Sequence, residues 1–311
     1  MTIAILCSGQ GCQRAGMFDL TGAAPHAADL FAHARALLGH DPREWVRSAS
    51  ADALCENRPA QILCTLQALA AMAVLDGLLP KRRCVAGYSV GEVAAWSVAG
   101  FMDALTALDL VAARASAMDA ATSSGEGMLF VRGLDRPAIE RLCADRAAAL
   151  AIANPGGAYV LAGKHDALDA ISADAKRLGA SRIAPVAVSI ASHTRLLATA
   201  SPVFREALAR ARIELAPLPG TRLFCGIDGT TVLDVGVGLD KLARQIAEPV
   251  EWATCLAGCV EAGATAFLEL GPGRALAEMA ALAYPALPAR SLVDFRSWDG
   301  VSSWIARIDD R

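Results

Sequence analysis

The segment VAGYSVGEVAAW, residues 85–96, places one serine in a glycine-flanked turn between an apolar run and a helix-like run. Gly87, Ser89 and Gly91 fit the G-x-S-x-G pattern of a nucleophile elbow, in which a strand folds back sharply into a helix and exposes the serine. The start of the helix supplies free N–H groups and a positive dipole end, which suit a developing oxyanion. The pattern predicts that Ser89 is a nucleophile; the alternative is a residue in a tight structural turn.

A nucleophilic serine needs a general base nearby. His193 ends the apolar run PVAVSIASH, where a predicted strand would deliver its side chain to the rim of a site. The other four histidines fall in segments that read as solvated helix, loop or turn: His26, His33, His40 and His165. We therefore expect His193 to be the base.

The group that would orient His193 is less evident. Asp166 or Asp174 would give the chain order Ser…Asp…His of α/β-hydrolases. Both fall in a predicted turn and helix, where carboxylates are normally solvated. The residues alone do not indicate an acidic third member.

The composition describes a chain that can bury a large core of small aliphatic side chains. It has 311 residues, of which 54% are hydrophobic and only 5% aromatic, and its formal charge is −3. Without a basic excess, nucleic acid and anionic membranes are not expected as partners. The N-terminal apolar run is too short for a signal peptide, and no segment reaches about 18 uncharged apolar residues. We expect a soluble, cytoplasmic protein.

The nine cysteines are scattered singly, without the paired spacing of a zinc site. No metal is therefore expected. Eight of them are expected to be small core hydrophobes: Cys7, Cys55, Cys64, Cys84, Cys143, Cys225, Cys255 and Cys259.

Strand, glycine turn and helix recur along the chain, which indicates a parallel sheet covered by helices. Residues 2–7 are a predicted strand, 25–80 are helical, and RRCVAGYS leads through a strand and turn into a helix from Val90 to about Ala99. A helix follows at about 103–120, and TRLFCGI and TAFLELG are later strands. Residues 229–238 read as a glycine-rich loop.

The middle of the chain has a different pattern. GMLFVRG, ALAIANP, AYVLAGK and SRIAPVAVSIASH are predicted strands, with helices after the first and third, in the order βαββαβ of a ferredoxin-like unit. The predicted fold is a large α/β-hydrolase-like domain with a parallel sheet, residues 1–122 and 194–311. A small ferredoxin-like domain, residues 123–193, is inserted into it.

Four separated motifs, taken together, make the chain resemble the malonyl-CoA:acyl-carrier-protein transacylases along nearly its whole length. SGQGCQRAGM resembles the N-terminal loop of that family, GYSVGE its elbow, IASH its histidine motif and ELGPGRAL its late strand and turn. The joint match in order and spacing is far more specific than any one motif.

The resemblance implies a role for each matched residue. Ser89 would carry the acyl group, with His193 as its general base. The backbone N–H groups of Gln10 and Val90 would form the oxyanion hole. Gln245, in LARQIAEPVEW, would orient the histidine through its backbone carbonyl, so that the site is a Ser–His dyad with a carbonyl as third member.

Arg114, in LVAARASAM, matches the family arginine that binds the free carboxylate of malonyl. A planar guanidinium binds a carboxylate through two hydrogen bonds and stays charged when desolvated. A solvated helix arginine is the alternative reading. This residue separates a malonyltransferase from a lipase, whose acyl pocket would be apolar.

Within the family, the chain most resembles the malonyl transferase (epsilon) subunit of malonate decarboxylase. Tyr88 stands where fatty-acid transacylases generally have His, the histidine motif is IASH, and the tail ARSLVDFRSWDG is similar. Cys12 stands where a small Ser or Ala is usual, and we expect it to pack rather than react. The IASH motif also resembles that of transferases accepting methylmalonyl units.

The expected reaction is a ping-pong transfer of malonyl from malonyl-CoA, through a malonyl-serine, to the thiol of an acyl carrier protein. No cofactor is expected, since the acceptor thiol belongs to the carrier. The alternatives are the fatty-acid-synthesis transacylase, a serine esterase and a non-catalytic carrier-docking protein. The basic run KRRC, residues 81–84, would suit an acidic carrier, although such a run before a strand is more often a solvated cap.

Overall fold

A five-stranded parallel sheet forms the centre of the protein in the computed structural model, which describes residues 1–309. β1 (Thr2–Cys7) lies between β2 (Arg82–Gly87) and β8 (Ala266–Glu269), and β7 (Thr221–Phe224) and β9 (Ala289–Ser291) form the edges. All four pairings are parallel, so the carboxyl ends of these strands meet at one edge of the sheet. That edge is where ligands bind in open α/β sheets.

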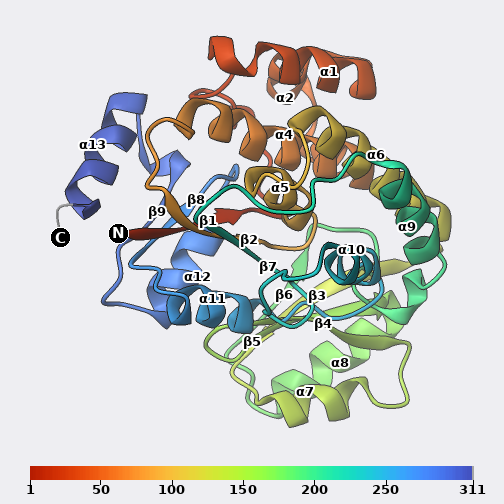
Figure 1. Cartoon of the computed structure of the whole chain (residues 1–311). Helices are drawn as coiled ribbons and strands as arrows, with labels where there is room; N and C mark the ends of the chain where they lie inside the picture. Colours follow the sequence, from red (N-terminus) through yellow and green to blue (C-terminus); the bar gives the residue numbers. More distant parts are fainter. Residues whose placement is uncertain (310–311) are drawn as a thin grey trace.

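Helices cover both faces of this sheet (Figure 1). α5 (Gly91–Val98), with α4 (Asn57–Leu75) and α6 (Ala104–Ala121) beside it, covers one face; α11 (Trp252–Glu261) and α12 (Ala275–Ala283) cover the other. α4 is long and apolar enough to cross a membrane by length and composition alone. However, 78% of its most apolar window is buried inside the protein, as expected for a core helix.

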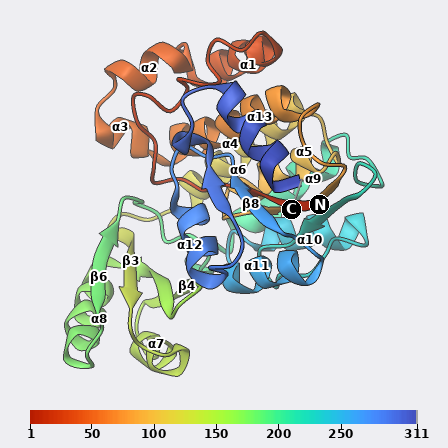
Figure 2. The same cartoon turned by 90° about the vertical axis from the view of Figure 1, so that its left-hand side faces the viewer.

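The remaining helices surround this body. α1 (Ala28–Leu38), α2 (Pro42–Ser48) and α3 (Ala51–Cys55) lie beside α4; α9 (Ala200–Arg210) packs on α6; and α13 (Trp298–Asp309) ends close to the N-terminus, as Figure 2 shows. Three short 3-10 turns are η1 (Pro25–Ala27), η2 (Arg195–Leu197) and η3 (Leu292–Asp294). The amino group of Met1 lies 3.5 Å from a carboxylate oxygen of Asp309.

The prediction of a glycine-rich loop over 229–238 was wrong in its second half. α10 (Val235–Arg244) begins inside it. The Asp234 side chain accepts a hydrogen bond from the Val237 N–H at 2.8 Å and so caps this helix despite its glycines.

A second, antiparallel sheet lies apart from the first and has the order β4–β5–β3–β6 (Figure 2). Its strands are β3 (Glu126–Arg132), β4 (Ala148–Asn154), β5 (Ala158–Lys164) and β6 (Arg182–Val186). α7 (Arg136–Cys143) and α8 (His165–Arg177) cover its outer face. This is the ferredoxin-like βαββαβ arrangement, so the predicted fold class is confirmed; the domain boundaries at 122/123 and 193/194 stay a prediction.

Alternating side chains of the antiparallel sheet build two cores. Leu129, Val131 and Leu161 point outward and pack with Ile139 and Ile171 of the two helices. Met128, Ile152 and Val160 belong instead to the core shared with the parallel sheet. The small sheet therefore faces the edge that carries Ser89 with apolar side chains.

The last predicted strand of this unit is shorter than the apolar run suggested. β6 ends at Val186, and residues 187–193 leave the sheet in tight turns, with the Val188 N–H bonded to the Val186 carbonyl and the Ser192 N–H to the Ile190 carbonyl. Val188 and Ile190 are buried although they lie in a loop. The run is apolar because these two residues are buried in a loop and not because they form a strand. A buried loop and a buried strand give the same apolar pattern in the sequence, which is why a strand was predicted here.

All nine cysteines are free, and six of the eight expected in the core are buried. Cys55 and Cys143 are half-buried, because each lies in the last turn of a short surface helix. Cys143 still packs against the small core, so the expectation was wrong for Cys55 and is met in part for Cys143. Cys12 is exposed, which contradicts the packing role expected for it.

Candidate active site

Ser89 lies between β2 and α5 with a backbone φ of 55°, in the left-handed region that side chains other than glycine rarely adopt. This is the strained turn expected of a nucleophile elbow. The two neighbouring glycines are required because any Cβ atom at their positions would clash with backbone atoms. A Cβ on Gly87 would lie 2.2 Å from backbone atoms of Glu92, and a Cβ on Gly91 would lie 2.1 Å from the Cys7 carbonyl oxygen.

His193 contacts Ser89 directly. Its Nε2 lies 2.7 Å from Ser89 Oγ, and its Nδ1 lies 2.5 Å from the backbone carbonyl oxygen of Gln245. Because a carbonyl only accepts, Nδ1 must carry the proton and Nε2 must accept from the serine hydroxyl. The structure thus brings together the serine, the base and the carbonyl that were predicted to act as a unit.

The protonation state of His193 suits a base. Burial, together with the nearby positive charge of Arg114, lowers the pKa of His193 to about 3, although the bond to Gln245 opposes this shift. The ring is therefore neutral at physiological pH and free to take the proton of Ser89.

The predicted position of His193 at the end of a strand was wrong. It lies seven residues beyond β6 with a φ of 63°, and its backbone N–H donates to the Ile246 carbonyl at 2.8 Å. The base is held by the segment after α10, the same segment that contributes the Gln245 carbonyl.

No carboxylate among residues 1–309 takes the third position. Asp174 is paired with Arg146 and Arg177 in the small domain, and Asp166 accepts from the N–H of Ala167. Of the other histidines, His33 pairs with Asp109 at 2.7 Å and His40 stacks on Trp45. An acidic triad of the hydrolase type is thus not formed.

Arg114 is fully buried and lies next to this dyad. Its Nη1 donates to Gln61 Oε1 at 2.7 Å, and its Nη2 donates to the side-chain oxygen of Gln245 at 3.3 Å. Its Nε is buried and has no hydrogen-bond partner among residues 1–309. Desolvation lowers the pKa of Arg114 to about 10, so the group stays charged at neutral pH.

Two polar residues that sequence reasoning missed complete this region. Gln61 is buried in α4, and its Nε2 donates to Asn57 Oδ1 at 2.6 Å. Glu92 is buried at the start of α5; it accepts from the Gly226 N–H at 2.9 Å and from the Gln245 side-chain amide. Burial raises the pKa of Glu92 to about 7, although both hydrogen bonds oppose that shift. Each could have been identified in the sequence as a polar residue that interrupts an otherwise apolar helix.

The loop after β1 passes close to the elbow. A Cβ on Gly9 would lie 2.9 Å from the Tyr88 carbonyl oxygen and 3.7 Å from Ser89 Cβ, which places Gln10 beside the serine. The backbone N–H groups of Gln10 and Val90 have no acceptor in residues 1–309. They are available as the two donors that an oxyanion hole requires.

The same loop is anchored from behind by a second buried carboxylate. Glu269, at the end of β8, accepts from Ser8 Oγ at 2.6 Å and from the N–H of Ala277 in α12 at 2.9 Å. Burial raises its pKa to about 7. Gly271 leaves the space that Ser8 occupies, since a Cβ there would lie 1.8 Å from Ser8 Oγ.

A small cavity of about 60 Å³ lies in front of Ser89 and His193. The polar part of its lining includes Gln10, Ser192 and the two catalytic candidates; the apolar part comes from Met128, Ile152, Val160, Val186 and Val188. Tyr88 also lines it and packs edge-to-face on Trp252, with ring centroids 5.3 Å apart. Burial raises the pKa of Tyr88 to about 12, so its phenol stays neutral.

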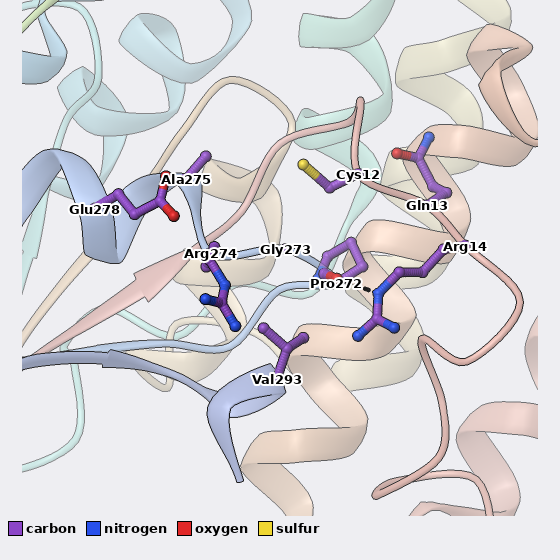
Figure 3. A pocket seen from close by; sticks show the side chains of 9 residues that line it. All are labelled: Cys12, Gln13, Arg14, Pro272, Gly273, Arg274, Ala275, Glu278 and Val293. Carbon is purple, nitrogen blue, oxygen red and sulfur yellow. Dashed lines mark hydrogen bonds between the residues drawn. The ribbon is translucent and has the colours of Figure 1, made fainter.

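A larger hollow of about 610 Å³ lies between the loop after β1 and the turn after β8 (Figure 3). Cys12 and Arg14 reach it from the loop after β1, and Pro272 and Arg274 from the turn after β8. Arg14 Nε donates to the Pro272 carbonyl at 3.3 Å and links the two loops. Cys12 is exposed as a residue, but its thiol lies against Gly273; this partial desolvation and the charge of Glu269 raise the pKa of Cys12, which makes its thiol a poorer nucleophile.

The basic run 81–84 lies at the amino end of β2, at the opposite edge of the sheet from Ser89. Arg83 is nearly buried; it donates to the Pro80 carbonyl at 2.8 Å and pairs with Asp76 at 3.2 Å. This run therefore caps the strand, and docking of a carrier there would place it far from the serine.

Comparison with known proteins agrees with this site. The sequence signature described as acyl transferase domain matches residues 5–221. The malonyl CoA-acyl carrier protein transacylase of Mycobacterium tuberculosis is 32% identical over 297 residues, which covers 93% of this chain and 96% of that protein.

Solved structures match over almost the full length. An acyl-carrier-protein S-malonyltransferase from Burkholderia pseudomallei 1710b superposes with a TM-score of 0.89 at 30% identity, covering 97% of this chain and 100% of its own. A malonyl-transacylase solved with its type II PKS acyl-carrier protein has a TM-score of 0.89 at 27% identity, covering 99% and 100%. The chain therefore belongs to the malonyl-CoA:acyl-carrier-protein transacylase family and is an acyltransferase.

Proposed function

We propose that this protein transfers malonyl from malonyl-CoA to the thiol of an acyl carrier protein through a malonyl ester on Ser89, as the names of its relatives suggest. The observation that carries the proposal is the Ser89–His193–Gln245 chain of contacts beside a buried arginine. We expect it to act in the cytoplasm, without a resident cofactor.

The acylation step follows from this geometry. Ser89 Oγ attacks the thioester carbonyl while His193 Nε2 takes its proton, and the N–H groups of Gln10 and Val90 donate to the oxyanion. The C–S bond then breaks and His193 returns the proton to the leaving CoA thiol. The second half-reaction runs the same steps in reverse with the carrier's thiol. Losing one oxyanion donor typically costs a rate factor of about 10²–10³.

Arg114 supports the preference for a dicarboxylic acyl group. Its Nε is a buried donor that lacks an acceptor among residues 1–309, and leaving such a donor unpaired is costly. The free carboxylate of a malonyl group would supply that acceptor and would neutralise the buried charge. An acetyl group offers neither.

Intact-mass spectrometry after brief incubation with malonyl-CoA, acetyl-CoA or methylmalonyl-CoA tests the proposal. We expect a malonyl adduct on the wild type, no adduct on Ser89→Ala, and a preference for acetyl in Arg114→Ala. The methylmalonyl arm reports how far a branched malonyl group is tolerated. The absence of any adduct on folded wild-type protein would overturn the proposed function.

A role as the epsilon subunit of malonate decarboxylase is a second candidate, supported by Tyr88, the IASH motif and the tail 289–300. The names of the relatives favour a transacylase of fatty-acid or polyketide synthesis instead. Comparing transfer rates from the malonyl-enzyme to a fatty-acid carrier and to a malonate decarboxylase carrier protein separates the two. A clear preference for the decarboxylase carrier would favour the second candidate.

A further inference from the structure

Gln245 is bonded in three directions, and each bond leads to a different part of the site. Its backbone carbonyl accepts from His193, its side-chain oxygen accepts from Arg114, and its side-chain nitrogen donates to Glu92. Gln245 itself is fully buried. One residue therefore fixes both the base and the arginine.

The orientation of the Gln245 amide depends on Glu92. A carboxylate accepts hydrogen bonds, so it selects the NH₂ end of the amide and turns the oxygen toward Arg114. Glu92 is itself held in place, because its Oε2 also accepts from the Gly226 N–H at 2.9 Å. Without an acceptor at position 92, nothing on that side would distinguish the two ends of the amide.

We propose that Glu92 is a positioning residue for acyl selectivity: by fixing the Gln245 amide, it holds Arg114 in the orientation that meets the carboxylate of the acyl group. This inference rests on the proposed function. Gln61 fixes Nη1 from the other side at 2.7 Å. The guanidinium is thus held by two amide oxygens, while its Nε has no acceptor among residues 1–309 and is the donor assigned here to the substrate carboxylate.

Glu269 provides a matched control inside the same protein. It is equally buried and also accepts a side-chain and a backbone hydrogen bond. Its partners are Ser8 and Ala277, which belong to the Gln10 loop and α12 and form no hydrogen bond with Arg114 or Gln245 within residues 1–309. A Glu269 variant therefore shows how much the activity changes when any buried carboxylate near the site is altered.

The test is the ratio of kcat/KM for malonyl-CoA to that for acetyl-CoA, measured as CoA release by the full-length protein. A misplacement of about 1 Å can cost up to about 10²-fold in rate, so Glu92→Leu is expected to lower the ratio by about 10-fold or more. Glu92→Gln keeps an acceptor and should hold the ratio within about 3-fold of wild type. Glu269→Gln should leave the ratio unchanged.

The proposal is overturned if folded Glu92→Leu keeps the wild-type ratio, or if Glu92→Gln loses as much selectivity as Glu92→Leu. Should Glu92→Leu not fold, Glu92→Ala removes the same acceptor, leaves room for water, and is judged by the same ratio. Wild-type protein that forms no malonyl adduct would defeat the proposed function; an adduct with an unchanged ratio in the variants would defeat this inference alone.

Discussion

The two walls of the cavity in front of Ser89 differ in chemistry. The polar wall presents Gln10 and Ser89 from the loops after β1 and β2 and His193 from the loop after β6, and behind it lie side chains linked by hydrogen bonds. The wall from the antiparallel sheet presents Met128, Ile152, Val160 and Val186, which have no hydrogen-bonding side chain. Bond making and charge recognition are therefore concentrated on one wall, while the other excludes water and limits the shape of the acyl group.

The largest effect is expected from the polar wall. His193→Ala should slow CoA release from malonyl-CoA by about 10²–10⁴-fold, the usual contribution of a general base. The measurement is stopped-flow acylation, with circular dichroism to show that the variant is folded. A loss of less than about 10-fold would mean that another group removes the serine proton and would break the contrast between the walls.

The pH dependence sharpens the same contrast. The pKa of His193 is lowered to about 3, so its neutral form persists down to about pH 4 and the acylation rate should not fall with a midpoint near 6.5. Glu92 and Glu269 are also buried and each has a pKa of about 7, so Glu92→Gln and Glu269→Gln are the controls. A midpoint near 6.5 that persists in both variants would show that His193 is not desolvated.

Substitutions in the apolar wall should mainly lower the free energy of unfolding and have little effect on the chemistry. Val160→Ala deletes buried methyl groups, for which we expect a loss of about 1–3 kcal/mol in the free energy of unfolding. The acylation rates with malonyl-CoA and acetyl-CoA should fall together, each by less than about 10-fold, because no charge is recognised there. Urea unfolding and the two rates are the measurements. A selective loss of malonyl transfer would assign charge recognition to this wall as well.

The smallest effect on the chemistry is expected at Glu269, behind the Gln10 loop. Its pKa is raised above the unfolded value, so the folded state binds more protons between about pH 4.5 and 7, and stability from this group falls as pH rises through that window. Glu269→Gln should remove that slope, by up to about 3 kcal/mol, while acylation changes only a few-fold. Urea midpoints at pH 5 and pH 7.5 test it; parallel curves for the two proteins would contradict it.

The residues that carry motifs were predictable from sequence, and so were the two sheets. Gly87 and Gly91 mark the elbow because only glycine fits against Glu92 and Cys7, and that steric requirement is visible as a pattern. The strand order of the small unit follows from βαββαβ, confirmed in the order β4–β5–β3–β6.

Not every contact between distant segments was predictable from the residues themselves. The pairing of His193 with Ser89 was expected, but its place in a loop was not, and the Gln245 carbonyl was implied only by the family resemblance, because the residue type is irrelevant to a backbone bond. Gln61 and Glu92 are polar residues within buried helix faces, and only tertiary packing shows that they share Gln245 and Arg114. Cys55 and Cys143 lie half-exposed because surface helices end there, which composition does not reveal.

Both members of the dyad have left-handed backbone, Ser89 at 55° and His193 at 63°. Such positions cost about 1–3 kcal/mol each in a non-glycine residue and persist only where the surrounding structure imposes them. The active site is thus a place where the fold is less stable than it would be with glycine, and selection for stability alone would remove both side chains. Ser89 and His193 are kept at these positions because their chemistry is needed, and packing elsewhere in the chain must compensate for the stability that is lost there.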